Sequence, residues 1–128
     1  MKKLVFKQFL PGIIWFFIVL VGLCFPGSGN KDKKSWFDSI YGDKFVHAFL
    51  FGLLVYFFVK PILKAELTLK EKRAWLLKIA LAGSIWGLTT EFIQKFFIPN
   101  RSFELMDWAA DTCGIIIAAF YLHNKSNQ

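Results

Sequence analysis

Four long apolar blocks dominate this sequence and decide which folds are open to it. They cover residues 9–25, 45–63, 75–97 and 105–122. A transmembrane helix needs about 20 consecutive, mostly apolar residues, and each block approaches that length. The chain also carries 16 phenylalanines and 5 tryptophans among 128 residues, more than the small interior of a soluble domain readily holds. We therefore predict an all-α, polytopic membrane protein whose single domain, residues 1–128, is a bundle of four transmembrane helices.

The segments that flank the blocks carry helix-boundary signals. Thr68 and Glu71 form the pattern of a capping box before the third block, so this helix should begin outside the apolar core. Turn and N-cap residues precede the second block at 42–43 and the fourth block at 99–102. Residues 36–41 place their aromatic and aliphatic side chains on one side of a short helical repeat, which is typical of a segment lying in the headgroup plane. We expect this interfacial segment to follow the first helix.

The first block has two interpretations. Lys2 and Lys3 precede it, as they would in a cleaved signal peptide. Its apolar run is longer than the usual signal-peptide core of roughly 7 to 15 residues, and Pro26 follows it as a helix stop. We therefore expect the block to be retained as the first membrane span.

Lysine and arginine residues are distributed unevenly between the two sides of the predicted bundle. Ten lie at the N-terminus, in the segment 60–78 and in the C-terminal tail, and six lie on the opposite side. The positive-inside rule then predicts that both termini are cytoplasmic. The lysines stand at the edges of apolar blocks rather than in a nucleic-acid-binding motif, so the net charge of +7 indicates membrane lipids as partners and no nucleic acid.

Ionisable and amide residues inside or beside the blocks converge on one end of the bundle. His47 starts the second block, Glu91 lies near the end of the third, and Asp107 starts the fourth. Because successive helices alternate in direction, these positions meet at the same end, whichever face that is. Charged groups at membrane depth usually face the bundle interior or a water-filled cavity. We expect a polar pocket whose ligand-binding residues are Asp43, Lys44, His47, Glu91, Gln94, Arg101, Asp107 and Asp111.

The residue types in this pocket limit its chemistry. The guanidinium of Arg101 offers a bidentate fork for phosphate, pyrophosphate or carboxylate. The candidate acid/base groups are Glu91, His47 and Asp107. Oxygen ligands from Asp107, Asp111 and Glu91 could hold a hard cation, but their spacing across separate helices is a weak signal, so we assign no metal site and expect no cofactor. No GxSxG, HExxH or Walker pattern is present, and the sequence does not decide whether the protein is an enzyme.

A purely structural interpretation competes with the pocket. In it, His47 pairs with Asp43, Glu91 neutralises Lys95, and Arg101 ties Asp107 to the connecting turn. Any one of these residues alone fits that view. The acids and the arginine together favour a functional pocket, because intramembrane carboxylates are usually functional.

Other features indicate packing. Small residues recur every four positions as Gly83 and Gly87 ahead of Glu91, and again as the series 110, 114 and 118 in the fourth block. Such stripes let helix backbones approach closely, so we expect them to form the seam of the bundle. Cys24 and Cys113 lie in apolar blocks without CxxC spacing, which predicts buried packing residues rather than a disulfide or a zinc site.

The order and spacing of the polar motifs resemble the VanZ-like family of small bacterial membrane proteins. The motifs are Asp43-Lys44-(two residues)-His47, Glu91-(two)-Gln94, Arg101 and Asp107-(three)-Asp111-Thr112-Cys113-Gly114. The resemblance implies a multi-pass protein of the bacterial cytoplasmic membrane, connected with the cell envelope, in a family whose founding member is associated with resistance to the glycopeptide teicoplanin. It implies no settled reaction. The family usually carries Asn at the position of Asp111, so the resemblance implies an additional acid in this chain.

Two functions follow as hypotheses. In the first, the polar end binds an anionic lipid or a lipid-linked peptidoglycan-precursor headgroup through Arg101, while the acids and His47 fix its orientation. In the second, the protein is an enzyme acting on a lipid-linked phosphorylated substrate, with Glu91 or His47 as acid/base. Proton or ion transport is less favoured, because the ionisable residues stay at one end. The sequence does not indicate an oligomeric state.

Overall fold

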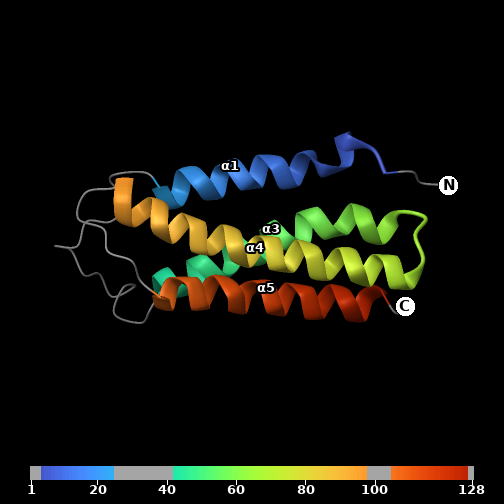
Figure 1. Ribbon diagram of the computed structural model, residues 1–128. Helices are drawn as coiled ribbons and strands as arrows, with labels where there is room; N and C mark the ends of the chain where they lie inside the picture. The colour runs from blue at the N-terminus through green and yellow to red at the C-terminus, as the bar shows by residue number, and fades with distance from the viewer. Residues whose placement is uncertain (1–3, 25–41, 98–104, 127–128) are drawn as a thin grey trace.

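The computed structural model describes residues 4–24, 42–97 and 105–126, and within these ranges every regular element is helical (Figure 1). A short 3-10 helix, η1 (Phe6–Phe9), leads into α1 (Leu10–Cys24), and α3 (Gly42–Lys64), α4 (Leu69–Phe97) and α5 (Leu105–Ser126) follow. The helices run alternately up and down, and both chain termini lie at the end where α3 connects to α4 (Figure 1). The predicted all-α bundle is confirmed. The predicted interfacial segment 36–41 lies outside the described residues.

Among the described residues, three helices are long and apolar enough to cross a membrane. These spans are Lys44–Lys64, Leu69–Phe97 and Leu105–Lys125, with 21, 29 and 21 residues. The N-terminal apolar helix, Phe6–Gly22, is shorter than the other three. At about 1.5 Å per residue, the 15 residues of α1 extend about 22 Å, less than the roughly 30 Å of a hydrocarbon core. Local thinning of the bilayer is the expected accommodation.

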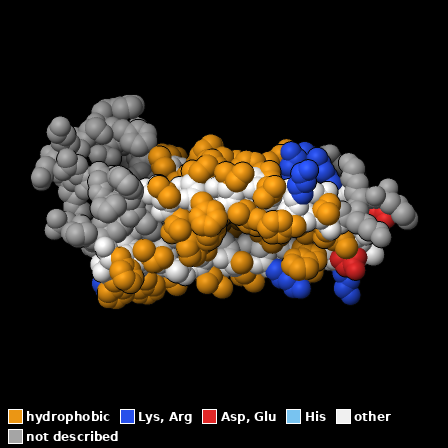
Figure 2. Space-filling view, turned by 90° about the horizontal axis from the view of Figure 1, so that it is seen from above, with side chains coloured by type: hydrophobic (Ala, Val, Ile, Leu, Met, Phe, Trp, Pro, Cys, Tyr) orange, Lys and Arg blue, Asp and Glu red, His pale blue; other side chains and the backbone are white. Residues whose placement is uncertain are grey.

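The distribution of side chains is the reverse of that in a soluble protein. Large apolar side chains are exposed on every long helix, for example Phe17 on α1, Phe49 on α3, Ile85 on α4 and Phe120 on α5. Figure 2 shows this apolar surface over the middle of the bundle, with Lys and Arg side chains gathered near the end where the termini lie in Figure 1. Lipid is the solvent that accepts such a surface.

The start of α4 follows the predicted capping box. The backbone N–H of Thr68 donates to Glu71 Oε2 at 2.8 Å, and the backbone N–H of Glu71 donates to Thr68 Oγ1 at 3.2 Å. These two bonds satisfy donors that a helix N-terminus otherwise leaves without partners. The helix therefore begins at Leu69, ahead of the apolar block, as the sequence predicts.

Small residues set the distance between helices. A Cβ atom added to Gly114 on α5 would lie 2.0 Å from the backbone oxygen of Ala48 on α3, and one added to Gly52 would lie 3.1 Å from the oxygen of Gly114. A Cβ on Gly83 of α4 would lie 3.2 Å from Ile115 Cδ1. The predicted packing role of the small residues is thus observed at Gly83 and Gly114, and it lets α3, α4 and α5 approach closely enough for short side chains to meet.

Two tryptophan side chains also join neighbouring helices through hydrogen bonds. Trp15 Nε1 donates to the backbone oxygen of Leu50 at 2.9 Å, which fastens α1 to α3. Trp108 Nε1 donates to the oxygen of Ser84 at 3.0 Å, which fastens α5 to α4. One prediction needs correction here: Cys113 is exposed rather than buried. Cys113 lies two residues after the buried Asp111, which is about 200° around the helix. Its side chain therefore points away from the face of α5 that packs in the bundle.

Substituting alanine for Gly114 tests this packing. The new methyl group would meet a backbone atom that cannot rotate away, so we expect Gly114→Ala to destabilise the protein by about 3 kcal/mol. The matched control is Gly22→Ala, because a Cβ at Gly22 meets nothing within 4 Å. Thermal unfolding in detergent measures both variants, and equal melting temperatures would contradict the close approach of α3 and α5.

Candidate functional site

The buried polar residues of the bundle come from three helices. Among the described residues, the buried polar and charged side chains are His47, Thr90, Glu91, Gln94, Asp107 and Asp111. They lie near the start of α3, the end of α4 and the start of α5, which meet at the end of the bundle opposite the termini (Figure 1). The convergence that alternating topology predicts is therefore observed.

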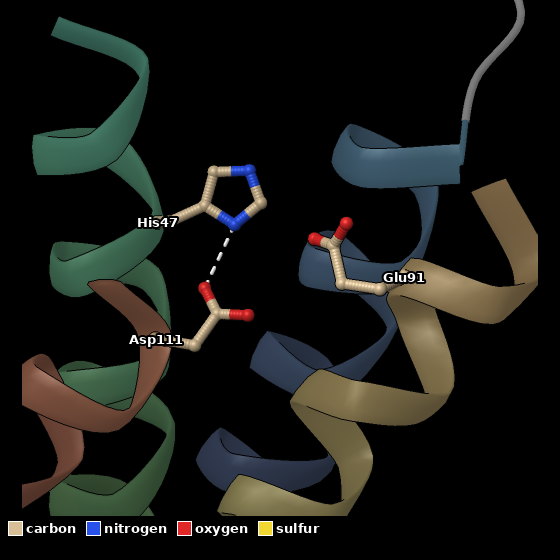
Figure 3. Close-up of side chains that lie close together, drawn as sticks. All are labelled: His47, Glu91 and Asp111. Atoms are coloured by element: carbon tan, nitrogen blue, oxygen red, sulfur yellow. Dashed lines mark hydrogen bonds and ion pairs between the residues drawn. The ribbon is translucent and has the colours of Figure 1, made fainter. Parts of the chain in front are cut away.

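Three members of this set, His47, Glu91 and Asp111, form an inner cluster. His47 Nδ1 lies 2.7 Å from Asp111 Oδ1, a hydrogen bond that joins α3 to α5. Glu91 projects from α4 toward the other two (Figure 3). One potential ligand atom from each of the three residues lies within 4.8 Å of the others. The inner cluster thus brings an imidazole and two carboxylates together inside the bundle.

An outer pair lies nearer the end of the bundle. The ammonium of Lys44 on α3 forms an ion pair with Asp107 Oδ1 on α5. Their side chains are 19% and 9% exposed, compared with 6% for His47 and 0% for Asp111. Asp107 Oδ2 lies 3.8 Å from His47 Nε2. Asp107 therefore links the outer pair electrostatically to the inner cluster.

The remaining predicted residues differ in their placement. Gln94 is buried, one turn beyond Glu91 on α4. Lys95 is exposed, and its ammonium lies 5.4 Å from the centroid of the Phe96 ring. Such a position suits a lysine that reaches toward the membrane surface. The side chains of Asp43 and Arg101 lie outside the described ones.

The packing of Asp111 depends on a glycine. A Cβ atom added to Gly87 on α4 would lie 3.0 Å from Asp111 Oδ2 and 3.3 Å from its Cβ. The absent side chain leaves the space that the carboxylate occupies. The spacing of small residues assigns Gly87 to the packing seam, but it does not reveal that Asp111 fills the space across this glycine.

Two buried polar groups were missed by sequence analysis. Thr90 is fully buried, and its hydroxyl donates to the backbone oxygen of Gly87 at 2.7 Å, within its own helix. Trp86 Nε1 is buried and has no hydrogen-bond partner among the described residues. The burial of Thr90 could have been expected from its position next to Glu91 in the sequence. Nothing in the sequence distinguished Trp86 from the other tryptophans.

The fold and the cluster define a polytopic helical membrane protein with ionisable residues buried at one end. A family model described as VanZ/LLP1 matches residues 9–124, nearly the whole chain, and the protein belongs to this family. The resemblance indicated by the motifs is thereby confirmed. No curated protein and no solved structure matches the chain significantly.

A double-mutant cycle tests the pairing of His47 with Asp111. Removing one partner of a buried hydrogen-bonded pair leaves the other buried without its partner, so His47→Ala and Asp111→Ala should each reduce stability by about 3 kcal/mol. The second substitution then removes a group that has already lost its partner, and the double variant should be about 2 kcal/mol more stable than the sum of the single effects implies.

Unfolding in mixed detergent micelles provides the measurement. Lys95→Ala is the control, because this exposed lysine lies beside the cluster in sequence and its loss should change stability by less than about 0.5 kcal/mol. Strictly additive effects of the two cluster substitutions would show that His47 and Asp111 do not interact.

Proposed function

We propose that this protein binds the headgroup of an anionic lipid or a lipid-linked peptidoglycan precursor at the polar end of its bundle. In this proposal the polar end lies at the extracytoplasmic face of the bacterial cytoplasmic membrane, and both termini are cytoplasmic. The uneven distribution of lysine and arginine supports that orientation.

The observation that carries the proposal is the burial of polar side chains contributed by three helices at one membrane end. Glu91 and Asp111 are fully buried, and His47 and Asp107 nearly so. Burying a carboxylate at membrane depth is unfavourable unless it is paired or hydrated, and a bundle with only a structural role could use apolar residues in these positions. A binding site for a polar headgroup explains why the acids are present.

The charges near this end divide between the two tasks that a headgroup requires. Lys44 is partly exposed beside Asp107, and Arg101 belongs to the segment that joins α4 to α5. These cations suit phosphate oxygens, and arginine in particular can bind them in a bidentate manner. Carboxylates and His47 can accept hydrogen bonds from hydroxyl or amide groups of the headgroup and so fix its orientation.

Family membership supports a role in the cell envelope. The founding member of the VanZ-like family is associated with teicoplanin resistance. A protein that holds a lipid-linked peptidoglycan precursor by its headgroup would change how accessible that precursor is. A contribution to glycopeptide resistance is therefore part of the proposal.

Native mass spectrometry with defined lipids tests headgroup binding. The protein is purified in detergent, and phosphatidylglycerol or undecaprenyl phosphate is added at equal concentrations. Loss of one charge-assisted contact of about 1.4 kcal/mol corresponds to a tenfold lower affinity, so Arg101→Ala should reduce the bound fraction of either lipid by about that factor.

The matched control is Arg73→Ala, which removes the same charge from an exposed site at the opposite end of α4. It should leave the bound fraction within about twofold, because an exposed charge contributes less than about 1 kcal/mol. Equal losses from the two variants would indicate general attraction of anionic lipid and would overturn the proposed site. Retention of one lipid but not the other by wild-type protein would identify the headgroup class.

One observation favours an enzymatic alternative. A carboxylate that accepts a hydrogen bond from an imidazole holds that ring in a fixed orientation, and His47 and Asp111 have this arrangement at 2.7 Å. Glu91 faces the pair from α4 and could transfer a proton to a lipid-linked phosphorylated substrate (Figure 3). Under this alternative, cells expressing Glu91→Gln differ in envelope lipid composition from cells with wild type at matched levels. Identical compositions would exclude it.

A further inference from the structure

The inner cluster contains the donor atoms of a metal site. His47, Glu91 and Asp111 each offer one potential ligand atom, and these atoms lie within 4.8 Å of one another. The three side chains come from α3, α4 and α5 and face a common point between the helices (Figure 3). In a tetrahedral zinc site with bonds of about 2.0 to 2.2 Å, neighbouring ligand atoms are about 3.3 Å apart. Because the atoms lie up to 4.8 Å apart, binding would require the side chains to close by up to about 1.5 Å.

One carboxylate oxygen of Asp111 has no hydrogen-bond partner in the part of the chain that the structure describes. Asp111 is 0% exposed, and its Oδ2 atom has no hydrogen-bond partner among the described residues, although its Oδ1 atom pairs with His47. Figure 3 shows this second oxygen on the side that faces Glu91. Buried polar atoms in native structures normally have partners, and one that does not often indicates an ion or a water molecule. The observation is independent of the spacing of the three residues.

The charges of the inner cluster match a divalent ion. A neutral imidazole and two carboxylates carry a combined charge of −2, which one divalent cation neutralises. A neutral assembly is favoured in a low-dielectric interior, where a net charge is strongly destabilised. Metal ligands must be deprotonated, so binding would be coupled to the release of any proton that these side chains carry.

Asp107 lies where its carboxylate could orient His47 as a metal ligand. Its Oδ2 atom lies 3.8 Å from His47 Nε2, the ring nitrogen that does not face Asp111. Histidine ligands commonly direct their second nitrogen toward a carboxylate, which orients the ring and strengthens it as a donor. Lys44 in turn holds the other oxygen of Asp107. The outer pair of Lys44 and Asp107 would therefore orient the imidazole of His47 toward the metal ion.

We propose that His47, Glu91 and Asp111 bind one divalent first-row transition-metal ion, with Zn²⁺ as the best match. One imidazole nitrogen and two carboxylate oxygens suit Zn²⁺, Mn²⁺ or Fe²⁺ better than Mg²⁺ or Ca²⁺, which favour oxygen ligands alone. Three protein ligands leave a fourth position open to water or to an oxygen of a bound anion. This assignment differs from a hard-cation site of Asp107, Asp111 and Glu91, because Asp107 is engaged by Lys44 and His47 takes its place.

The experiment measures Zn²⁺ alone. Protein purified in detergent is stripped with a chelator, and Zn²⁺ binding is determined by competition with a fluorescent indicator and by elemental analysis after desalting. Wild type should retain one Zn²⁺ per chain. His47→Ala and Asp111→Asn should weaken binding by at least about 100-fold, since loss of an outer-shell partner alone weakens metal binding by about 10- to 100-fold.

The chain offers a matched control for the histidine. His123 is the other of its 2 histidines and lies at the opposite end of α5, so His123→Ala should bind Zn²⁺ as wild type does. Cys113→Ala serves as the background, because a free exposed thiol can bind zinc adventitiously. Equal losses from His47→Ala and His123→Ala, or no Zn²⁺ retained by wild type, would overturn the proposal as an adventitious ion only.

Cobalt substitution keeps the proposal testable if a cluster variant fails to fold. Co²⁺ bound by wild type at a four-coordinate nitrogen and oxygen site should give intense visible bands without thiolate charge-transfer absorption. Weak bands typical of octahedral Co²⁺, or thiolate absorption, would contradict the assignment. Arg101→Ala should retain Zn²⁺ while it loses lipid, so failure of the metal site and failure of headgroup binding are distinguishable.

Discussion

A bilayer has no water to satisfy polar groups, and this constraint explains both the helices and the cluster. Backbone groups in hydrocarbon must be hydrogen-bonded within the chain, which leaves helices as the spanning elements of this protein. Side chains such as Asp111 face the same requirement. The carboxylate of Asp111 is fully buried and obtains a partner from another helix, His47 at 2.7 Å. The helix arrangement and the polar pairing therefore depend on each other.

Close backbone approach is the condition for that pairing. Short side chains such as Asp meet across helices only where small residues reduce the separation, and Gly114 and Gly87 do so on opposite sides of Asp111. Gly114 brings the backbone of α5 against Ala48, one residue after His47, and Gly87 leaves space for the carboxylate of Asp111. The polar cluster therefore depends on the packing seam, because the same small residues that bring the helices together allow the polar side chains to meet.

Hydropathy and helix-boundary signals predicted the bundle well because they depend on local sequence. The capping box of Thr68 and the convergence of His47 with Glu91 followed from periodicity and alternating direction alone. The hydrogen bond between His47 and Asp111 did not follow from them, because spacing within one helix does not reveal a partner on another helix. The exposure of Cys113 was missed for a related reason: hydropathy does not determine which face of a membrane helix meets lipid. Local spacing rules for metal sites likewise overlook ligands supplied singly by separate helices.

Headgroup binding and metal binding are proposed for adjacent parts of the same polar end, and each proposal supports the other. An anionic headgroup near Glu91 and Asp111 would meet unfavourable negative charge if both carboxylates were ionised and no cation were bound. A divalent ion bound by the inner cluster would neutralise both acids and present an open coordination position. Lys44 and Asp107 lie between this cluster and the end of the bundle, where their mutual pairing limits the net charge a ligand meets. In the combined proposal the acids would hold the cation, and the cation, with Arg101, would attract the phosphate, which would account for carboxylates at a site for an anion.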